Sequence, residues 1–244
     1  MTTRPAPSLA AVVLSARGGA RLVAALAALD WVDRRVVLAF DDDLVCTVPL
    51  PPDVIQVASA TRLDELDADW ILLLGEEERI APEDVPRIRD AIASATPGEV
   101  LALRVVTVAL DLRVRLGRPV PRLAPRGTSL RIGPGFDIVF RCAARARPLD
   151  VTIARSRGAT LTDAVELAGA DAAMFAAIVD RGPGRGRGIL WHPVVAAART
   201  FGARAVDGRL GVGRWILAVL EGYRVVVAYA KLWERRRKRV VVLE

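Results

Sequence analysis

The sequence predicts an α/β fold built around a parallel sheet, and three stretches support this prediction. Leu9–Ser15 and Asp33–Phe40 are apolar runs of strand length, and Ala20–Leu29 between them consists largely of strong helix formers. Strand, helix and strand within about thirty residues form a βαβ unit, whose two strands must be parallel. Trp70–Leu74 is a further uninterrupted apolar run, typical of a strand that is buried on both faces.

The rest of the first 180 residues continues this alternation of strands and helices. Proline and two acids at Pro82–Asp84 are typical of a first helical turn. We expect helices at Pro82–Ala95 and Thr162–Asp180, a helical turn at Thr61–Leu66, short strands at Val54–Ala58, Asp137–Cys142 and Val151–Ala154, and one or two strands in Glu99–Leu116. Prolines and glycines among arginines predict an irregular crossover at Arg118–Gly135.

A short tract rich in glycine and arginine, Arg181–Gly188, divides the chain. Such a tract is typical of a flexible connection. We therefore expect a domain over residues 1–180 and a helical C-terminal extension over residues 189–244.

The extension carries apolar residues at helical spacing, and a basic segment follows them. The apolar positions are Trp215, Val219, Tyr223, Val226, Val227 and Ala230, and the basic segment is Glu234–Arg239. Tryptophan beside a cationic flank is typical of a helix that lies on an anionic membrane surface. The same face would also satisfy a protein core, so the sequence leaves both interpretations open.

Composition excludes several classes of protein. No run approaches the roughly 18 uncharged apolar residues that a spanning helix needs. Met1–Pro7 has neither the basic start nor the apolar stretch of a secretory signal. Cys46 and Cys142 are far apart in the sequence and fit buried thiols in a reducing compartment. We expect a cytoplasmic protein, and a C-terminal helix that lies on a membrane would place it on the inner face.

The charge of the chain is strongly positive but does not indicate nucleic-acid binding. The net charge is +7, and all but two of the 35 basic residues are arginines. These residues are dispersed, and aromatic residues make up only 5% of the chain. The single histidine, His192, excludes metal sites made of several histidines.

Acidic residues follow the apolar run at Trp70–Leu74. Gly75 comes first, then Glu76–Glu78, and Pro82 with Glu83 begins the expected helix. The carboxylates therefore lie at the carboxyl end of a central strand, where open α/β sheets bind their ligands. Three glutamates after a strand also occur in ordinary solvated loops.

This stretch resembles the signature Trp-Val-Leu-x-Leu-Asp-Ala-Asp-Glu-x-x-Ser/Thr-Pro-Glu of family 2 glycosyltransferases, in the branch that decorates lipopolysaccharide cores. The matching residues are Trp70, Leu74, Glu78, Pro82 and Glu83. Further similarity to the family lies, in the same order along the chain, at Val12–Leu22, Trp31–Leu38, Arg122–Gly127 and Phe201–Trp233.

The resemblance implies the GT-A fold, a Rossmann-like and mostly parallel sheet sandwiched by helices, here with a helical C-terminal tail. It also implies transfer of a sugar from a nucleotide-diphosphate sugar to a lipid-linked or polysaccharide acceptor in envelope glycan synthesis. In the family, the two aspartates of the signature hold a divalent metal, so the expected cofactor is Mg²⁺ or Mn²⁺.

Several residues depart from the family pattern. Gly75 and Glu77 replace the two aspartates of the signature. Arg17 and Gly18 replace an Asn-Glu pair, and a histidine expected near residue 153 is absent, with Arg155 close to its place. These losses leave two alternatives: an active hexosyltransferase, and an inactive pseudoglycosyltransferase that keeps the fold as a binding or scaffold protein.

The residues expected in the site follow from the resemblance and from the chemistry of inverting transfer, which needs a carboxylate base and positive charge beside the diphosphate. Glu77 and Glu78 are the expected metal ligands. The expected donor-binding residues are Ser15, Arg17, Asp41, Glu76, Arg122 and Arg126. Asp137 and Asp150 are the candidates for the catalytic base.

Overall fold

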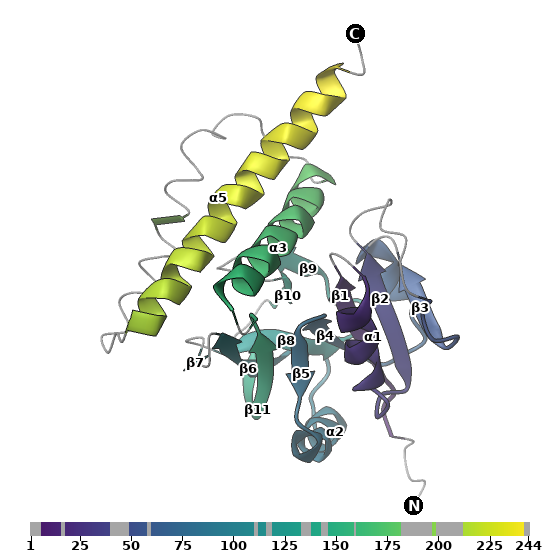
Figure 1. Ribbon diagram of the computed structural model, residues 1–244. Helices are drawn as coiled ribbons and strands as arrows, with labels where there is room; N and C mark the ends of the chain where they lie inside the picture. Colours follow the sequence, from purple (N-terminus) through teal and green to yellow (C-terminus); the bar gives the residue numbers. More distant parts are fainter. Residues whose placement is uncertain are drawn as a thin grey trace, which may run out of the picture. The chain divides into compact units, whose positions relative to one another are not determined.

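The computed structural model describes residues 6–15, 18–39, 49–57, 60–109, 112–115, 119–132, 138–142, 146–158, 160–181, 197–198 and 212–241 (Figure 1). The chain forms two compact units. The first, here called the sheet unit, comprises residues 1–107, 113–133 and 138–156, and the second, the helical unit, comprises residues 108–112, 134–137 and 157–244.

The sheet unit is built on a mixed sheet of nine described strands. Eight of them lie in the order β3-β2-β1-β4-β8-β6-β11-β5, and β7 pairs with β6. Their bounds are β1 Leu9–Ser15, β2 Arg34–Ala39, β3 Val54–Val57, β4 Trp70–Gly75, β5 Glu78–Ile80, β6 Leu101–Ala109, β7 Leu112–Arg115, β8 Val120–Pro125 and β11 Arg147–Ser156. A separate antiparallel pair joins β9 (Leu130–Ile132) to β10 (Ile138–Phe140).

The first four strands of the sheet are parallel. β1 pairs with β2 on one side and with β4 on the other, while β3 pairs with β2. After β3 the chain therefore crosses back over β1, and the switch in strand order falls between β1 and β4. This arrangement confirms the predicted βαβ unit and the α/β class, and it is compatible with a Rossmann-like fold, in which ligands bind beside such a switch point.

Beyond β4 the sheet is antiparallel where β8 joins it. β8 pairs with β4 and with β6, so residues 120–125 form an interior strand and the irregular crossover expected there is wrong. Its prolines fall where a ladder tolerates them: Pro125 is the last residue of the strand, and Pro121 lies beside a register shift. Leu123 and Ala124 between them are fully buried.

Two helices cover one face of the sheet. α1 (Ala20–Ala27) and α2 (Val85–Ala93) both contribute to a single apolar cluster with alternate residues of the strands. The members from the two helices and from β1 and β4 are Leu22, Ala25, Leu26, Ile88, Ala91, Ile92, Leu9, Ala11, Val13, Trp70, Leu72 and Leu74. The short 3₁₀ segments η1 (Ala60–Glu65) and η2 (Pro82–Asp84) confirm the expected helical turn and the proline-led start of α2.

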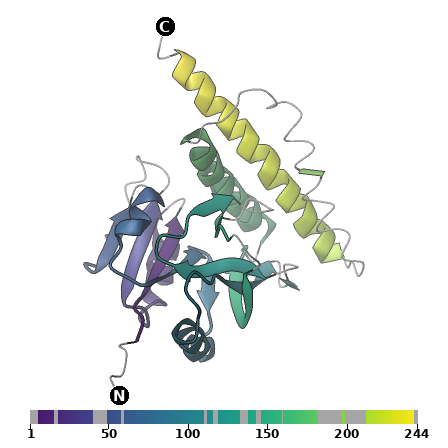
Figure 2. The ribbon, with the colours of Figure 1, turned by 180° about the vertical axis from the view of Figure 1, so that it is seen from behind.

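The helical unit contains two long helices that lie side by side, α3 (Leu161–Arg181) and α5 (Val212–Val241) (Figures 1 and 2). Ala172 of α3 and Ala228 of α5 are both buried and belong to one small apolar cluster. α3 thus belongs with α5, while the linker expected at 181–188 lies, apart from Arg181, outside the described residues. No helix in the described ranges has the length and apolarity needed to cross a membrane.

Candidate functional site

The three glutamates follow β4 at the switch point. In the parallel register Leu14 of β1 pairs with Gly75, and the Glu76 N–H donates to the Leu14 carbonyl at 3.2 Å. Gly75 ends β4, Glu76 and Glu77 form a turn, and Glu78 begins the short strand β5. The prediction that these carboxylates lie at the carboxyl end of a buried strand is therefore confirmed.

Glu76 is joined to the end of β1. The Ser15 hydroxyl donates to Glu76 Oε2 at 2.8 Å, and both residues are buried. The Gly18 N–H donates in turn to Ser15 Oγ at 3.0 Å. The structure thus brings together Ser15 and Glu76, two of the residues expected to bind the donor.

The turn between β1 and α1 presents backbone N–H groups at the same end of the sheet. Gly18 and Gly19 have φ of 67° and 89°, a left-handed conformation that glycine adopts without strain. Gly19 is the N-cap of α1 and has no side chain with which to cap the first N–H groups of the helix. A helix start of this kind favours an anion such as a phosphate.

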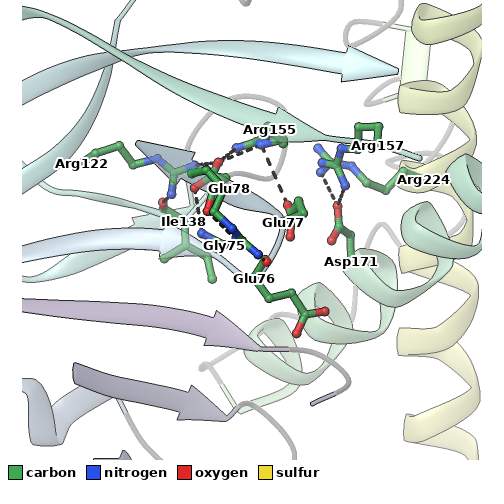
Figure 3. Close-up of polar contacts among 11 residues, drawn as sticks. Gly75, Glu76, Glu77, Glu78, Arg122, Ile138, Arg155, Arg157, Asp171 and Arg224 are labelled. Atoms are coloured by element: carbon green, nitrogen blue, oxygen red, sulfur yellow. Dashed lines mark hydrogen bonds and ion pairs between the residues drawn. The ribbon is translucent and has the colours of Figure 1, made fainter. Parts of the chain in front are cut away.

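Glu78 lies between two arginines in a cluster that we call the sheet cluster: Glu78, Arg122 and Arg155 (Figure 3). Arg122 Nη2 donates to Glu78 Oε1 at 2.9 Å, and Arg155 donates to the same oxygen from Nε at 2.8 Å and from Nη2 at 2.6 Å. The other oxygen, Oε2, accepts the Gly75 N–H at 2.7 Å. The Glu78 side chain is completely buried, at 0% exposure.

The strand ladder explains how this cluster forms. β5 pairs antiparallel with β11, and in that register Arg155 lies directly opposite Glu78. Arg122 comes from β8 and also donates from Nη1 to the Ile138 carbonyl at 3.2 Å. Among the described residues its Nε has no hydrogen-bond partner, although it is buried. Two different strands, β8 and β11, therefore supply the two cations, and the charge of Glu78 offsets part of the cost of burying them.

The environment of Glu78 determines its charge state. Burial acts to raise the pKa of the Glu78 carboxyl, but Arg122, Arg155 and the Gly75 N–H together outweigh burial and hold that pKa below its ordinary value. Glu78 is therefore ionised throughout the neutral range, and its charge is neutralised inside the protein.

Glu77 and Arg79 complete the surroundings of the cluster. Glu77 Oε1 lies 4.0 Å from Arg155 Nε, and the Glu77 carbonyl accepts the Ser156 N–H at 3.0 Å. Arg79 Nη1 donates to the carbonyls of Glu76 and Glu78 at 2.9 and 2.7 Å. Burial lowers the pKa of Arg79, against the raising effect of Glu77 and Glu76. An arginine side chain therefore lies beside each of the three glutamates, Glu76, Glu77 and Glu78.

Glu78 does not fit the divalent cation that the resemblance implies. Both oxygens of Glu78 already accept hydrogen bonds, and a cation bound there would lie beside two guanidinium groups. Within the described part of the chain, no three His, Cys, Asp or Glu side chains are grouped so as to hold a metal. Glu78, expected as a metal ligand, is instead an internal partner of arginine.

The other expected site residues divide into two groups. Arg126 is exposed and donates to the Leu66 carbonyl at 3.1 Å, and Asp150 has an 88% exposed side chain 3.8 Å from Arg104. Arg17, Asp41 and Asp137 lie outside the described residues. The structure therefore joins Ser15 to Glu76 and Arg122 to Glu78, while Arg126 and Asp150 contact other groups.

A second carboxylate between two arginines, with a side chain that is 14% exposed, lies in the helical unit, and we call this group the helix cluster: Asp171, Arg157 and Arg224 (Figure 3). Arg224 Nη1 of α5 donates to Asp171 Oδ2 of α3 at 3.1 Å, and Arg157 Nη1 donates to the same oxygen. The sequence did not reveal this cluster. Its one signal was Arg224, a charged residue that interrupts the apolar run of α5.

No protein-family model matches the chain, and no curated protein matches it significantly.

Proposed function

We propose that this protein is a glycosyltransferase-like protein of the GT-A type. It binds a nucleotide-diphosphate sugar at the carboxyl ends of β1 and β4 and transfers the sugar to a lipid-linked or polysaccharide acceptor in envelope glycan synthesis. Its donor is held without a cation on Glu78. The observation that carries the proposal is the hydrogen bond between Ser15 and Glu76, which joins the two strands at the switch point of the parallel sheet.

The arrangement at this end of the sheet suits a diphosphate. The uncapped first turn of α1 offers backbone N–H groups, and Gly18 and Gly19 leave room for close approach. Gly75 and Glu77 stand here in place of the aspartates with which the family holds a metal. The Glu78 carboxylate is paired with arginine. Backbone donors and the helix start therefore supply the positive potential beside the phosphates.

Transfer to an acceptor also needs a carboxylate that takes the proton of the acceptor hydroxyl. Asp150 and Asp137 remain the candidates for this base. Asp150 is exposed, so a large glycan has access to its carboxylate.

A second candidate function is a catalytically inactive relative that binds a glycan precursor or acts as a scaffold. The observation that favours it is the sheet cluster, because Glu78, which we expected to bind a metal, is buried here and paired with arginines. In that case the protein keeps its fold and Glu76–Glu78 because they stabilise it, and it does not transfer a sugar.

Thermal shift with uridine and guanosine diphosphate sugars tests the proposal. A donor at 100 times its dissociation constant stabilises the folded state by roughly 2.7 kcal/mol, which is easily measured. The proposal predicts such a shift in the presence of EDTA. Ser15→Ala should weaken it, whereas Ser94→Ala, which removes an exposed hydroxyl at the end of α2, should leave it unchanged.

Donor binding and donor consumption then distinguish the two candidates. A shift accompanied by sugar transfer to lipid-linked acceptors supports the enzyme, and a shift without transfer or donor hydrolysis supports the inactive relative. The absence of a shift with every donor would contradict both the proposed site and the proposed function.

A further inference from the structure

The long helix α5 has two apolar faces that lie on different sides. One face is buried in the helical unit and comprises Ala218, Val225, Ala228 and Leu232, together with Arg224 of the helix cluster. The other face is exposed, and we call it the outer stripe: Trp215, Val219, Tyr223, Val226, Ala230 and Trp233. The exposed fractions of its large residues run from 43% for Tyr223 to 56% for Val219.

The outer stripe is continuous along the helix. Its members recur at intervals of three or four residues, so at about 100° per residue they fall within an arc of about 80°. From Trp215 to Trp233 the stripe extends for about 27 Å at the rise of an α-helix. Between these tryptophans, every exposed side chain that the structure describes is apolar or aromatic.

This finding separates the two interpretations that the sequence left open for α5. Burial against the helical unit is satisfied by the opposite face, which is already packed. The outer stripe lies on the other side of the helix and is exposed. An exposed apolar stripe of this length is typical of a surface that binds another protein, a ligand or a membrane.

We infer that the outer stripe binds an anionic membrane surface, with α5 lying in the plane of the interface. Charge complementarity identifies the occupant: five consecutive cations, Arg235–Arg239, come one residue, Glu234, after the end of the stripe, and the chain as a whole carries +7. Tryptophans occupy both ends of the stripe, where their amphipathic rings suit the headgroup region. No described helix is suited to cross a membrane, so α5 would lie on the surface.

Surface attachment also fits the acceptor class of the proposed function, but the inference does not depend on that function. A polar headgroup layer rich in phosphate would attract the basic segment, and the stripe would enter the boundary with the acyl chains. Each cation near such a surface contributes about 1 kcal/mol, so five of them are enough to make binding strongly dependent on salt.

Co-sedimentation with vesicles tests the inference. The full chain should sediment with phosphatidylcholine vesicles that contain phosphatidylglycerol, and much less with pure phosphatidylcholine or at high salt. Val219→Glu should weaken binding at least about tenfold, because it places a charge in the centre of the stripe. The matched control is Val165→Glu on α3, where the same change at a residue that is 36% exposed should leave binding unchanged.

Three further measurements keep the inference falsifiable. Brominated lipids should quench tryptophan fluorescence, and Trp215→Phe with Trp233→Phe should remove that quenching while keeping the stripe apolar. Equal binding by Val219→Glu and Val165→Glu, or no binding to anionic vesicles, would overturn the inference. So would light scattering that shows a dimer dissociated by Val219→Glu, since the stripe would then be a contact between copies. Val219→Glu should leave the donor-induced thermal shift intact, so failure of one proposal is distinguishable from failure of the other.

Discussion

The sheet cluster and the helix cluster have the same composition, one carboxylate between two arginines, but they differ in how the carboxylate is held. In the sheet cluster the arginines share Glu78 Oε1, a backbone N–H occupies Oε2, and the side chain has 0% exposure. In the helix cluster both arginines donate to Asp171 Oδ2, and the aspartate side chain is 14% exposed.

The difference shows what each cluster does for its unit. Glu78 joins β5, β8 and β11 at the end of the sheet, and the strand ladder fixes the residues opposite it. Asp171 links α3 to α5 and to the segment before α3. An acidic residue in a stretch that resembles a family signature can therefore serve the same structural purpose as one on an ordinary helix.

The largest effect should come from Glu78→Gln. This change removes the charge that compensates two buried guanidinium groups, and breaking a buried pair in this way costs about 3–5 kcal/mol. Chemical denaturation measures the free energy of unfolding directly. Glu65→Gln is the control, because that side chain is exposed and the same substitution should change stability by less than about 0.5 kcal/mol. Equal stability of the two variants would show that the sheet cluster is not a structural element.

The pH dependence of stability should follow the same group. The pKa of Glu78 is held below its ordinary value of 4.5 in the folded state, so its contribution is complete above that value and is lost as the pH falls through the folded-state pKa. The pKa of Asp33 and that of Glu99 are also lowered, so they act in the same direction. Unfolding free energies measured between about pH 6 and pH 3 should fall less steeply in Glu78→Gln than in the wild type. Parallel curves would contradict the lowered pKa.

Asp171→Asn should have a smaller effect than Glu78→Gln, about 2 kcal/mol, because the helix cluster retains some access to water. Asp67→Asn serves as the control, since it alters a surface pair with Arg34 in which the aspartate side chain is 93% exposed. A loss from Asp171→Asn as large as that from Glu78→Gln would remove the contrast between the two clusters.

Gly75→Ala should have the smallest effect of the series. An added Cβ would meet Glu77 Oε1 at 3.0 Å, and the end of that flexible side chain can move away. We expect a cost of about 1 kcal/mol, measured by denaturation. A loss of several kcal/mol would mean that the Glu77 carboxylate is fixed in place as firmly as that of Glu78.

Local patterns predicted the parallel half of the sheet well. The apolar runs that became β1, β2 and β4 are continuous because those strands are buried on both faces, and their spacing around α1 requires parallel pairing. The expectation failed at β8, where prolines and arginines indicated irregular structure. Those signals were overridden because Arg122 pairs with a glutamate 44 positions away, a contact that no local pattern encodes.

The candidate site was predicted only in part, and for the same reason. The carboxyl end of β4 was located correctly, because the sequence changes there from apolar to charged residues. Ser15 and Glu76 are in contact, as expected for one site. The ion pairing of Glu78 depends on Arg155, which lies opposite Glu78 in the antiparallel register of β5 and β11. The three-residue strand β5 is too short to give a periodic signal, so that register was not visible in the sequence.

The most direct test of the central claim is isothermal titration calorimetry of the donor that gives the largest thermal shift, in EDTA and in excess Mn²⁺. The claim is that a nucleotide-diphosphate sugar binds at the ends of β1 and β4 without a cation on Glu78. It predicts binding with the same Kd in both solutions. Binding that appears only with Mn²⁺, or no heat of binding in either solution, would contradict it.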